Sequence, residues 1–379
     1  MILTSAAAFL CKLSLAFFTI GTNDIHTWET FHVRYETAGV ETLYRDGVHV
    51  PGPTPHWQPM NHPPFAITLL RIWGTSESIT GLPLRFWLRA TAALADLACI
   101  VVLRRLFPHR RYLPALVAFS VAPGVIFISG YHGNTDTMMI AAVLSAVYFA
   151  TIGAPGKAGF AFALATCIKI LPVFLLPAFL LFFPDWRKRV RFLAVCTVAV
   201  FALSMPYFWE APVTIVKALI SYRSVVGVWG LSRLLGGGYS AYGLPILCIG
   251  VGVITWRCHR AKAPLAVTCG AVLAMFLALA PGFGVQYLAW LCPWVIALRT
   301  APAIAFYAVT GAFLFAIYTD TAAALPWYFS DFILRPSMTK RTATLAMLSW
   351  ISVLLVMMLY FTGRWRVAQS SLDHTESAT

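Results

Sequence analysis

Charged residues are scarce in this chain, and acidic residues are the scarcest. Only 11% of its 379 residues are charged and 14 are Asp or Glu, whereas 59% are hydrophobic and the mean hydropathy is +0.76. Apolar runs fill so much of the chain that little is left for a soluble domain. We therefore expect an integral membrane protein with many spans.

The chain also lacks paired cysteines and internal repeats. Its eight cysteines stand singly in or beside apolar runs, without a Cys-x-x-Cys pair, which is typical of small buried packing residues. Many transporters are built from repeats, and no repeat is visible here. This absence counts against a transporter.

Apolar runs of about 20 residues, enough to cross ~30 Å of hydrocarbon, occur about twelve times. They include 85–107, 112–130 and 285–299. Isolated strands cannot satisfy their backbone groups in lipid, so the predicted fold class is all-α: a polytopic transmembrane helical bundle of about twelve spans.

Basic clusters lie in the short gaps between the apolar runs. If the gaps with strong clusters are cytoplasmic, the spans alternate with both termini on that side. This placement explains the net charge of +14 through membrane topology and anionic lipids, so we expect membrane lipids and no nucleic acid as partners. The clusters cover 104–111, 187–191, 257–262 and 364–366.

One long polar stretch, 21–84, follows the first apolar run. We predict that it is the first extracytoplasmic loop, and that its apolar part over 63–80 is a helix lying in the membrane interface. The first run is interpreted as a retained helix, with a cleaved signal peptide as the less favoured alternative. Residues 1–366 are expected to form one integral-membrane domain, and 367–379 a disordered cytoplasmic tail.

Asp24 stands where the first span leaves the bilayer, and His26, Trp28 and Glu29 follow it. Polar residues and Trp are common at such boundaries for solvation alone. Alternatively, the carboxylate is a general base or ion ligand at a site on the outer face. The long polar stretch after it holds five of the 14 acidic residues: Asp24, Glu29, Glu36, Glu41 and Asp46.

A very short polar turn joins the spans on either side of residues 132–136. His132 and Asp136, four residues apart, could face one cavity, although Gly and Asn between them equally suit a plain tight turn. Ionisable residues inside apolar runs are costly to bury in hydrocarbon. Arg89 and Asp96 lie on one helical face, which suits a structural network, and Lys169 could snorkel or meet an anionic ligand.

A second polar stretch places Arg223 and Arg233 beside Tyr222 and Trp229. Arginine is suited to bidentate phosphate contact, although a solvated surface helix would look the same. Gln286 enters a later span from the same side.

Several histidines in the long polar stretch invite a zinc hypothesis. No pair of them has a helical metal spacing with an evident third ligand, so we expect no cofactor and no divalent metal. They are His26, His32, His49, His56 and His62.

Together these segments resemble the GT-C membrane glycosyltransferases, and most closely those that use dolichyl-phosphate-glucose in N-glycan precursor assembly, with their bacterial relatives. The shared features run from residue 20 to about 180. They are the Asp-containing segment 23–29, His62-Pro63-Pro64-Phe65 in place of a Tyr-Pro-Pro-Leu segment, Arg89 with Ala95-Asp96-Leu97, Pro123-Gly124 followed by His132, and the Lys169 segment. His62 and the turn 134–136 depart from the family pattern.

The resemblance implies an inverting hexosyltransferase in the bacterial inner membrane, with its active site on the extracytoplasmic face. A polyprenyl-phosphate-sugar would be the donor, and a lipid-linked or glycan molecule the acceptor. Asp24 would be the general base, and the predicted donor-phosphate ligands are Lys169, Arg223, Arg233, His132 and Gln286. The predicted sugar contacts are His26, Trp28, Glu29, His62, Asp136, Tyr222 and Trp229.

Two other functions remain open. A flippase for polyprenyl-phosphate or lipid-linked sugars would handle related ligands, but its polar residues would sit near the midplane of the membrane instead of gathering at one face. A membrane acyltransferase would need a buried catalytic histidine, whereas His132 lies in a short outer turn.

Overall fold

The computed structural model describes residues 1–50, 56–221, 225–227, 229–298, 300–322, 325–333 and 338–363. The fold is 79% helical, which confirms the all-α class. The long helices are α1 (Ile2–Phe18), α2 (Asn23–Arg45), α3 (Phe65–Thr80), α4 (Leu84–Leu106), α7 (Asp136–Thr151), α8 (Pro155–Ile168), α10 (Trp186–Phe208), α13 (Gly237–Arg260), α14 (Leu265–Leu279), α16 (Thr300–Thr321) and α17 (Lys340–Phe361).

Shorter elements connect these helices. The short α-helices are α5 (Leu113–Ser120), α6 (Pro123–Phe127), α9 (Leu176–Phe182), α11 (Pro212–Ser221), α12 (Gly230–Leu235) and α15 (Leu288–Leu291). Single 3-10 turns are η1 (Arg110–Tyr112), η3 (Leu171–Leu175), η4 (Val285–Tyr287) and η5 (Trp294–Ala297), and η2 (Ile128–His132) is a π-helical turn. The strands are β1 (Gly21–Thr22), β2 (Val48–Val50), β3 (His56–Gln58) and β4 (Phe329–Ser330).

Five of the described helices are long and apolar enough to cross a membrane: α4, α10, α16, α17 and the part of α13 from Ala241 to Arg260. The pair Arg110–Ser120 and Pro123–His132, bent by 45°, adds a sixth candidate. Further apolar helices of 10–17 residues accompany them. These helices support a multi-pass membrane protein, while the count of about twelve spans stays a prediction.

Two predicted spans depart from a continuous helix. The predicted span over 112–130 is broken at Pro123, because proline lacks the N–H that a helix interior needs. The predicted span over 285–299 is a shorter apolar helical stretch, Val285–Ala297, in which η4, α15 and η5 follow one another and Pro293 separates the last two. Residue 299 lies outside the described ranges.

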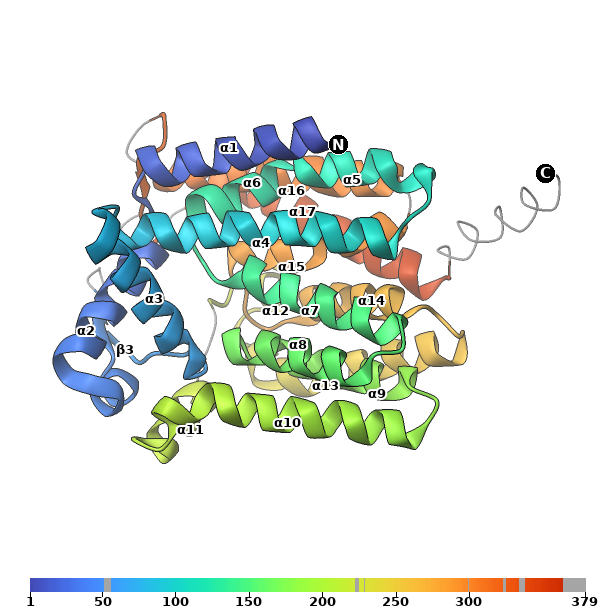
Figure 1. Cartoon of the computed structure of the whole chain (residues 1–379). Helices are drawn as coiled ribbons and strands as arrows, with labels where there is room; N and C mark the ends of the chain where they lie inside the picture. Colours follow the sequence, from blue (N-terminus) through green and yellow to red (C-terminus); the bar gives the residue numbers. More distant parts are fainter. Residues whose placement is uncertain are drawn as a thin grey trace.

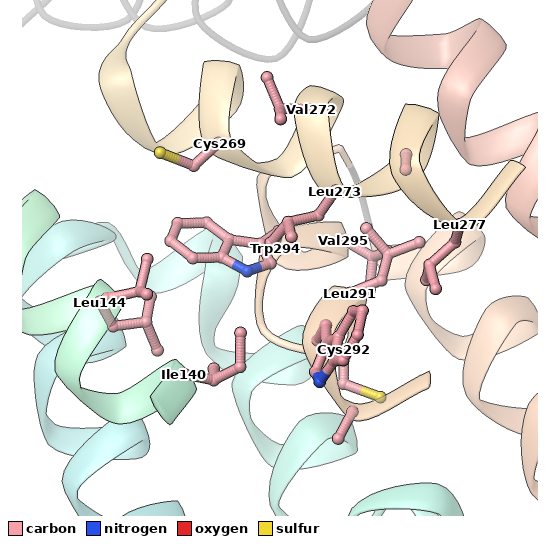
Figure 2. Close-up of a cluster of buried hydrophobic side chains, with 14 of the residues drawn as sticks. Ile140, Leu144, Cys269, Val272, Leu273, Leu277, Leu291, Cys292, Trp294 and Val295 are labelled. Carbon is pink, nitrogen blue, oxygen red and sulfur yellow. The ribbon is translucent and has the colours of Figure 1, made fainter. Parts of the chain in front are cut away.

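The centre of the bundle is formed around α14, which is apolar on every side and buried along nearly its whole length. Figure 2 shows Trp294 lying between the side chains of α14 and the side chains of Ile140 and Leu144 on α7. Trp294 is completely buried. By contrast, α10 exposes apolar residues such as Val198 and Phe201, as a helix facing lipid does.

The polar stretch after α1 is folded into helices and a hairpin. Helices α2 and α3 gather at one end of the bundle, while the basic C-terminal end of α4 lies at the other (Figure 1). Strands β2 and β3 pair antiparallel, and α2 is kinked at Gly39, whose φ of 75° suits glycine. The predicted helix over 63–80 is present as α3, and its place in the membrane interface stays a prediction. The predicted tail 367–379 lies outside the described residues.

Helix α4 holds α1 through two sets of buried contacts, made by residues on the same face of α4. Lys12 of α1 forms an ion pair with Asp96 of α4, and both side chains are nearly inaccessible. Two turns away, the guanidinium of Arg89 donates to the carbonyl oxygens of Ala16 and Thr19, both at 2.7 Å. Those carbonyls end α1 and lack partners within the helix. Arg89 and Asp96 therefore form the structural network that their spacing allows.

Candidate active site

At the junction of α1 and α2, the chain pairs with a segment from far along the sequence. Gly21 and Thr22 form β1, which pairs in parallel with Phe329 and Ser330 of β4. The hydroxyl of Thr22 donates to the carbonyl oxygen of His132 at 2.8 Å, which ties this junction to the π-helical turn η2. Helix α2 begins directly afterwards, and an acidic residue in its first turn suits the helix dipole. That residue is Asp24.

The carboxylate of Asp24 is held on one side and open on the other. Its Oδ2 accepts from the Nδ2 of Asn134 at 2.9 Å and lies 3.1 Å from the Nε2 of His132. Its Oδ1 has no hydrogen bond among the described residues, and 29% of the side chain is exposed. The carboxylate can therefore receive a further hydrogen bond from a ligand.

Burial opposes the charged form of Asp24, but three neighbours outweigh that effect. Interactions with His132, which include a hydrogen bond, a hydrogen bond from Asn134 and the charge of Lys169 together lower the pKa of Asp24 below its ordinary value. Asp24 is thus ionised at neutral pH.

His132 ends the π-helical turn η2, an uncommon element that is often found at functional sites. The side chain is 2% exposed, and its Nδ1 lies 3.1 Å from the hydroxyl of Tyr318 on α16. Gly133 follows with a φ of 74°, and a Cβ there would lie 1.9 Å from the side chain of Ile25. The turn therefore requires glycine at this position, so that α2 can approach His132.

A charged pair, Lys169 and Asp136, stands beside Asp24. The Nζ of Lys169, just after α8, lies 2.7 Å from the Oδ1 of Asp136 in the first turn of α7. Trp290 also donates to Oδ1 from its indole nitrogen, while Oδ2 has no partner among the described residues. The rings of Tyr287 and Trp290 lie 5.1 and 5.3 Å from Nζ, a cation–π arrangement. Lys169 keeps 15% of its side chain exposed and Asp136 keeps none.

His62 lies near the same lysine. Its ring packs against Trp28 with centroids 4.6 Å apart, and Nδ1 has no hydrogen-bond partner in the described parts of the chain. Burial, followed by the positive charge of Lys169, lowers the pKa of His62 to about 3. This imidazole is therefore neutral, and it offers a lone pair or an N–H but no charge.

The structure brings together five predicted site residues: Asp24, His132, Asp136, Lys169 and His62. They come from α2, η2, α7, the end of α8 and the segment before α3, and Lys169 acts electrostatically on both Asp24 and His62. The roles assigned to them stay predictions.

Three other predicted residues lie along α2. Glu29 forms an ion pair with Arg85 of α4 at 3.2 Å, which fastens the two helices together. Trp28 is 3% exposed and packs against Trp73 and His62, which leaves little of its ring for a sugar. His26 is exposed and lines a mainly apolar hollow with His49.

The remaining predicted residues lie in the second half of the chain. Tyr222 and Arg223 lie outside the described residues. Arg233 is exposed on α12, and Trp229 is buried, stacked on Phe283 with centroids 4.0 Å apart. Gln286 lies in η4 beside Tyr287, the ring that lies near Lys169.

Sequence reasoning missed Tyr318 and the strand β4. Tyr318 ends an apolar run and is followed by Thr319 and Asp320, which form no recognised site motif. The sequence predicts Asn134 only as a turn residue, yet its amide nitrogen donates to Asp24. A lone tyrosine hydroxyl at the end of an apolar run was the available signal for Tyr318.

Metal binding has no evident place in the described ranges. No three His, Cys, Asp or Glu side chains come together there in a group that could hold a metal ion. That the chain works without a cofactor stays a prediction.

Comparison with known proteins places the chain in a family. Residues 61–281, more than half of the chain, match the sequence model of glycosyltransferase family 87. The matched region contains His132, Asp136 and Lys169, while Asp24 and Tyr318 lie outside it. No curated protein matches the chain.

Proposed function

Since this chain belongs to glycosyltransferase family 87, a family of GT-C-like membrane glycosyltransferases, we propose that it moves a hexose from a polyprenyl-phosphate donor to a lipid-linked or glycan acceptor. The chain is a multi-pass membrane protein. We place the reaction at the extracytoplasmic face of a bacterial inner membrane, where the end of the bundle formed by α2 and α3 would meet the lipid head groups.

The environment of Asp24 is the observation that carries this proposal. The carboxylate is ionised and half-buried, and two donors orient its Oδ2 while Oδ1 stays open. An acceptor hydroxyl is a poor nucleophile, and a positioned carboxylate is the base it requires. Asp24 takes the hydroxyl proton as the hydroxyl oxygen attacks the anomeric carbon.

The leaving group sets the second requirement. The bond between the anomeric carbon and the phosphate oxygen breaks with inversion, and polyprenyl phosphate departs with an additional negative charge. Fixed cations and N–H donors stabilise such a charge. Among the described lysines and arginines, Lys169 is the one whose charge lowers the pKa of Asp24. One of its three N–H groups is directed at Asp136, and the other two can bind a phosphate oxygen.

The other predicted ligands keep their places in this proposal. Arg223, Arg233, His132 and Gln286 are further donor-phosphate candidates. The sugar contacts proposed are His26, Trp28, Glu29, His62, Asp136, Tyr222 and Trp229. The displacement needs no metal ion, because the donor is a phosphodiester and protein cations can hold the phosphate that leaves.

The test uses purified protein in liposomes that contain native lipid extract. A panel of polyprenyl-phosphate sugars is added, and new glycosylated products are sought by mass spectrometry. We expect transfer by the wild type and a loss of at least about 10²-fold in Asp24→Asn, the usual cost of losing a general base. Asp46→Asn, at the partly exposed residue that follows α2, is the matched control and should transfer normally.

Two results would count against the proposal. Normal transfer by Asp24→Asn would remove Asp24 from the role of base. Movement of a labelled donor across the bilayer by wild type and Asp24→Asn alike, with no glycosylated product, would favour the flippase.

A further inference from the structure

His132 faces two groups at once, and these groups constrain where its proton resides. Nε2 lies 3.1 Å from the carboxylate of Asp24, and Nδ1 lies 3.1 Å from the hydroxyl of Tyr318. A carboxylate only accepts hydrogen bonds, so Nε2 must carry a proton to make this contact. The second contact then decides whether Nδ1 carries one as well.

Tyr318 favours an unprotonated Nδ1. The tyrosine is fully buried, and its hydroxyl has one hydrogen-bond partner among the described residues, which is His132. If Nδ1 carried a proton, the tyrosine hydrogen would be left buried without an acceptor. If the tyrosine donates to Nδ1, every polar hydrogen in this chain of contacts is satisfied.

The surroundings leave neither ring free to turn away. The carbonyl oxygen of Tyr318 accepts from Ser330, the ring of Tyr318 lies 5.3 Å from that of Tyr131, and Phe332 lies 6.1 Å from His132. The carbonyl oxygen of His132 is bound by Thr22. Both side chains are thus held at the positions that the contact needs.

We propose that Tyr318 is a positioning residue that fixes His132 as its Nε2–H tautomer, so that the imidazole donates to Asp24. The tautomer of a histidine is set by the hydrogen bond that its other nitrogen makes. Asp24 is then held by two N–H donors on Oδ2, and Oδ1 is directed to the incoming hydroxyl. The catalytic meaning of this arrangement rests on the proposed function, whereas the tautomer itself does not.

The test measures the tautomer directly. Protein labelled with ¹⁵N-histidine in detergent micelles is studied by ¹⁵N NMR, and the His132 signals are those absent from His132→Asn. We expect a protonated Nε2 and an unprotonated Nδ1 in the wild type. In Tyr318→Phe we expect a new population with protonated Nδ1, because the phenyl ring donates nothing.

Tyr131→Phe is the matched control. Tyr131 is equally buried and packs against Tyr318, but its hydroxyl pairs with Ser330 at 2.9 Å. We expect its His132 signals to match the wild type. A protonated Nδ1 in the wild type would overturn the proposal without any variant, and so would unchanged His132 signals in Tyr318→Phe.

A transfer assay adds a second readout. Tyr318→Phe should lower kcat by at least about tenfold, yet less than the about 10²–10⁴-fold expected for loss of the base, with little change in KM for the donor. Loss of the tautomer without any fall in kcat would show that His132 does not orient Asp24 for catalysis. Absence of transfer by the wild type would contradict the proposed function while the NMR result still decides the role of Tyr318.

Discussion

Lys169 forms an ion pair with Asp136, and it is also the proposed ligand of the donor phosphate. Its Nζ lies 2.7 Å from a carboxylate that is completely buried. Substituting Lys169 alone therefore leaves a buried charge without its partner, and lost activity would not by itself reveal a phosphate ligand. A pair of variants separates the two effects: Lys169→Met, and Lys169→Met combined with Asp136→Asn.

The magnitude follows from the geometry. At 2.7 Å and an effective dielectric constant of about 20, Coulomb's law gives an attraction of about 6 kcal/mol. Desolvation of both charges offsets much of this, so the pair adds little net stability. Removing one partner is different, because the remaining carboxylate stays buried, and the expected loss in the free energy of unfolding is about 3–5 kcal/mol.

The double variant removes that cost. Asp136→Asn is neutral, and its side-chain oxygen can still accept from Trp290. We expect the double variant to regain all but about 1 kcal/mol of the wild-type free energy of unfolding. Its affinity for a polyprenyl-phosphate donor should nevertheless stay at least about tenfold weaker than that of the wild type, a difference of about 1.4 kcal/mol.

Two measurements check this. Unfolding is followed by tryptophan fluorescence during titration of mixed micelles with SDS, and donor binding by calorimetry on the folded variants. Lys157→Met, at an exposed position of α8, is the control and should change stability by less than about 0.5 kcal/mol. Equal destabilisation of the single and double variants would refute the role of the buried carboxylate, and full donor affinity in the double variant would remove Lys169 from the phosphate site.

Two further predictions concern the partners of Asp24 and the packing of α1. Asn134→Ala removes a hydrogen bond that lowers the pKa of Asp24, so the pKa of Asp24 should rise. The acid limb of a pH profile of kcat/KM should then move to higher pH, and an unmoved limb would contradict this prediction. Ionised Asp24 contributes stability above its unfolded pKa, and this contribution is lost as the pH falls through its folded pKa. A higher folded pKa in Asn134→Ala makes that contribution smaller. Arg89→Met should lower the free energy of unfolding by at least about 3 kcal/mol in the SDS titration, because two carbonyl groups at the end of α1 lose a charged donor, whereas the exposed Arg110→Met should not.

The residues of the candidate site could be picked out from the sequence because each is a polar or ionisable residue within or beside an apolar run. Asp136 and Lys169 are ionisable residues within or at the ends of apolar runs, where charge is costly. Asp24 and His132 follow apolar runs that end on the same predicted side. Alternation of spans therefore predicts that they lie at the same face of the bundle, although not that His132 contacts Asp24 or that Lys169 pairs with Asp136.

Aromatic residues were less informative. The family resemblance predicts Trp28 and Trp229 as sugar contacts. In the structure, Trp28 packs against Trp73 and Trp229 stacks on Phe283, both almost wholly buried. An indole that packs against another ring and one that stacks on a sugar have the same sequence pattern, since both need an apolar body and a polar edge.

The contacts that complete the site join residues that lie far apart in the sequence. Asp24 and Tyr318 lie on either side of the family-matched region, almost 300 residues apart, yet His132 contacts both. The pairing of β1 with β4 is two residues long, too short for any alternation of polar and apolar positions to reveal it. That pairing brings the C-terminal segment beside the start of α2, where Phe332 donates from its backbone to the side chain of Asn23. The matched region thus supplies the cation and the histidine, while the carboxylate and the tyrosine that flank this histidine come from the segments before and after that region, and only the folded bundle joins them.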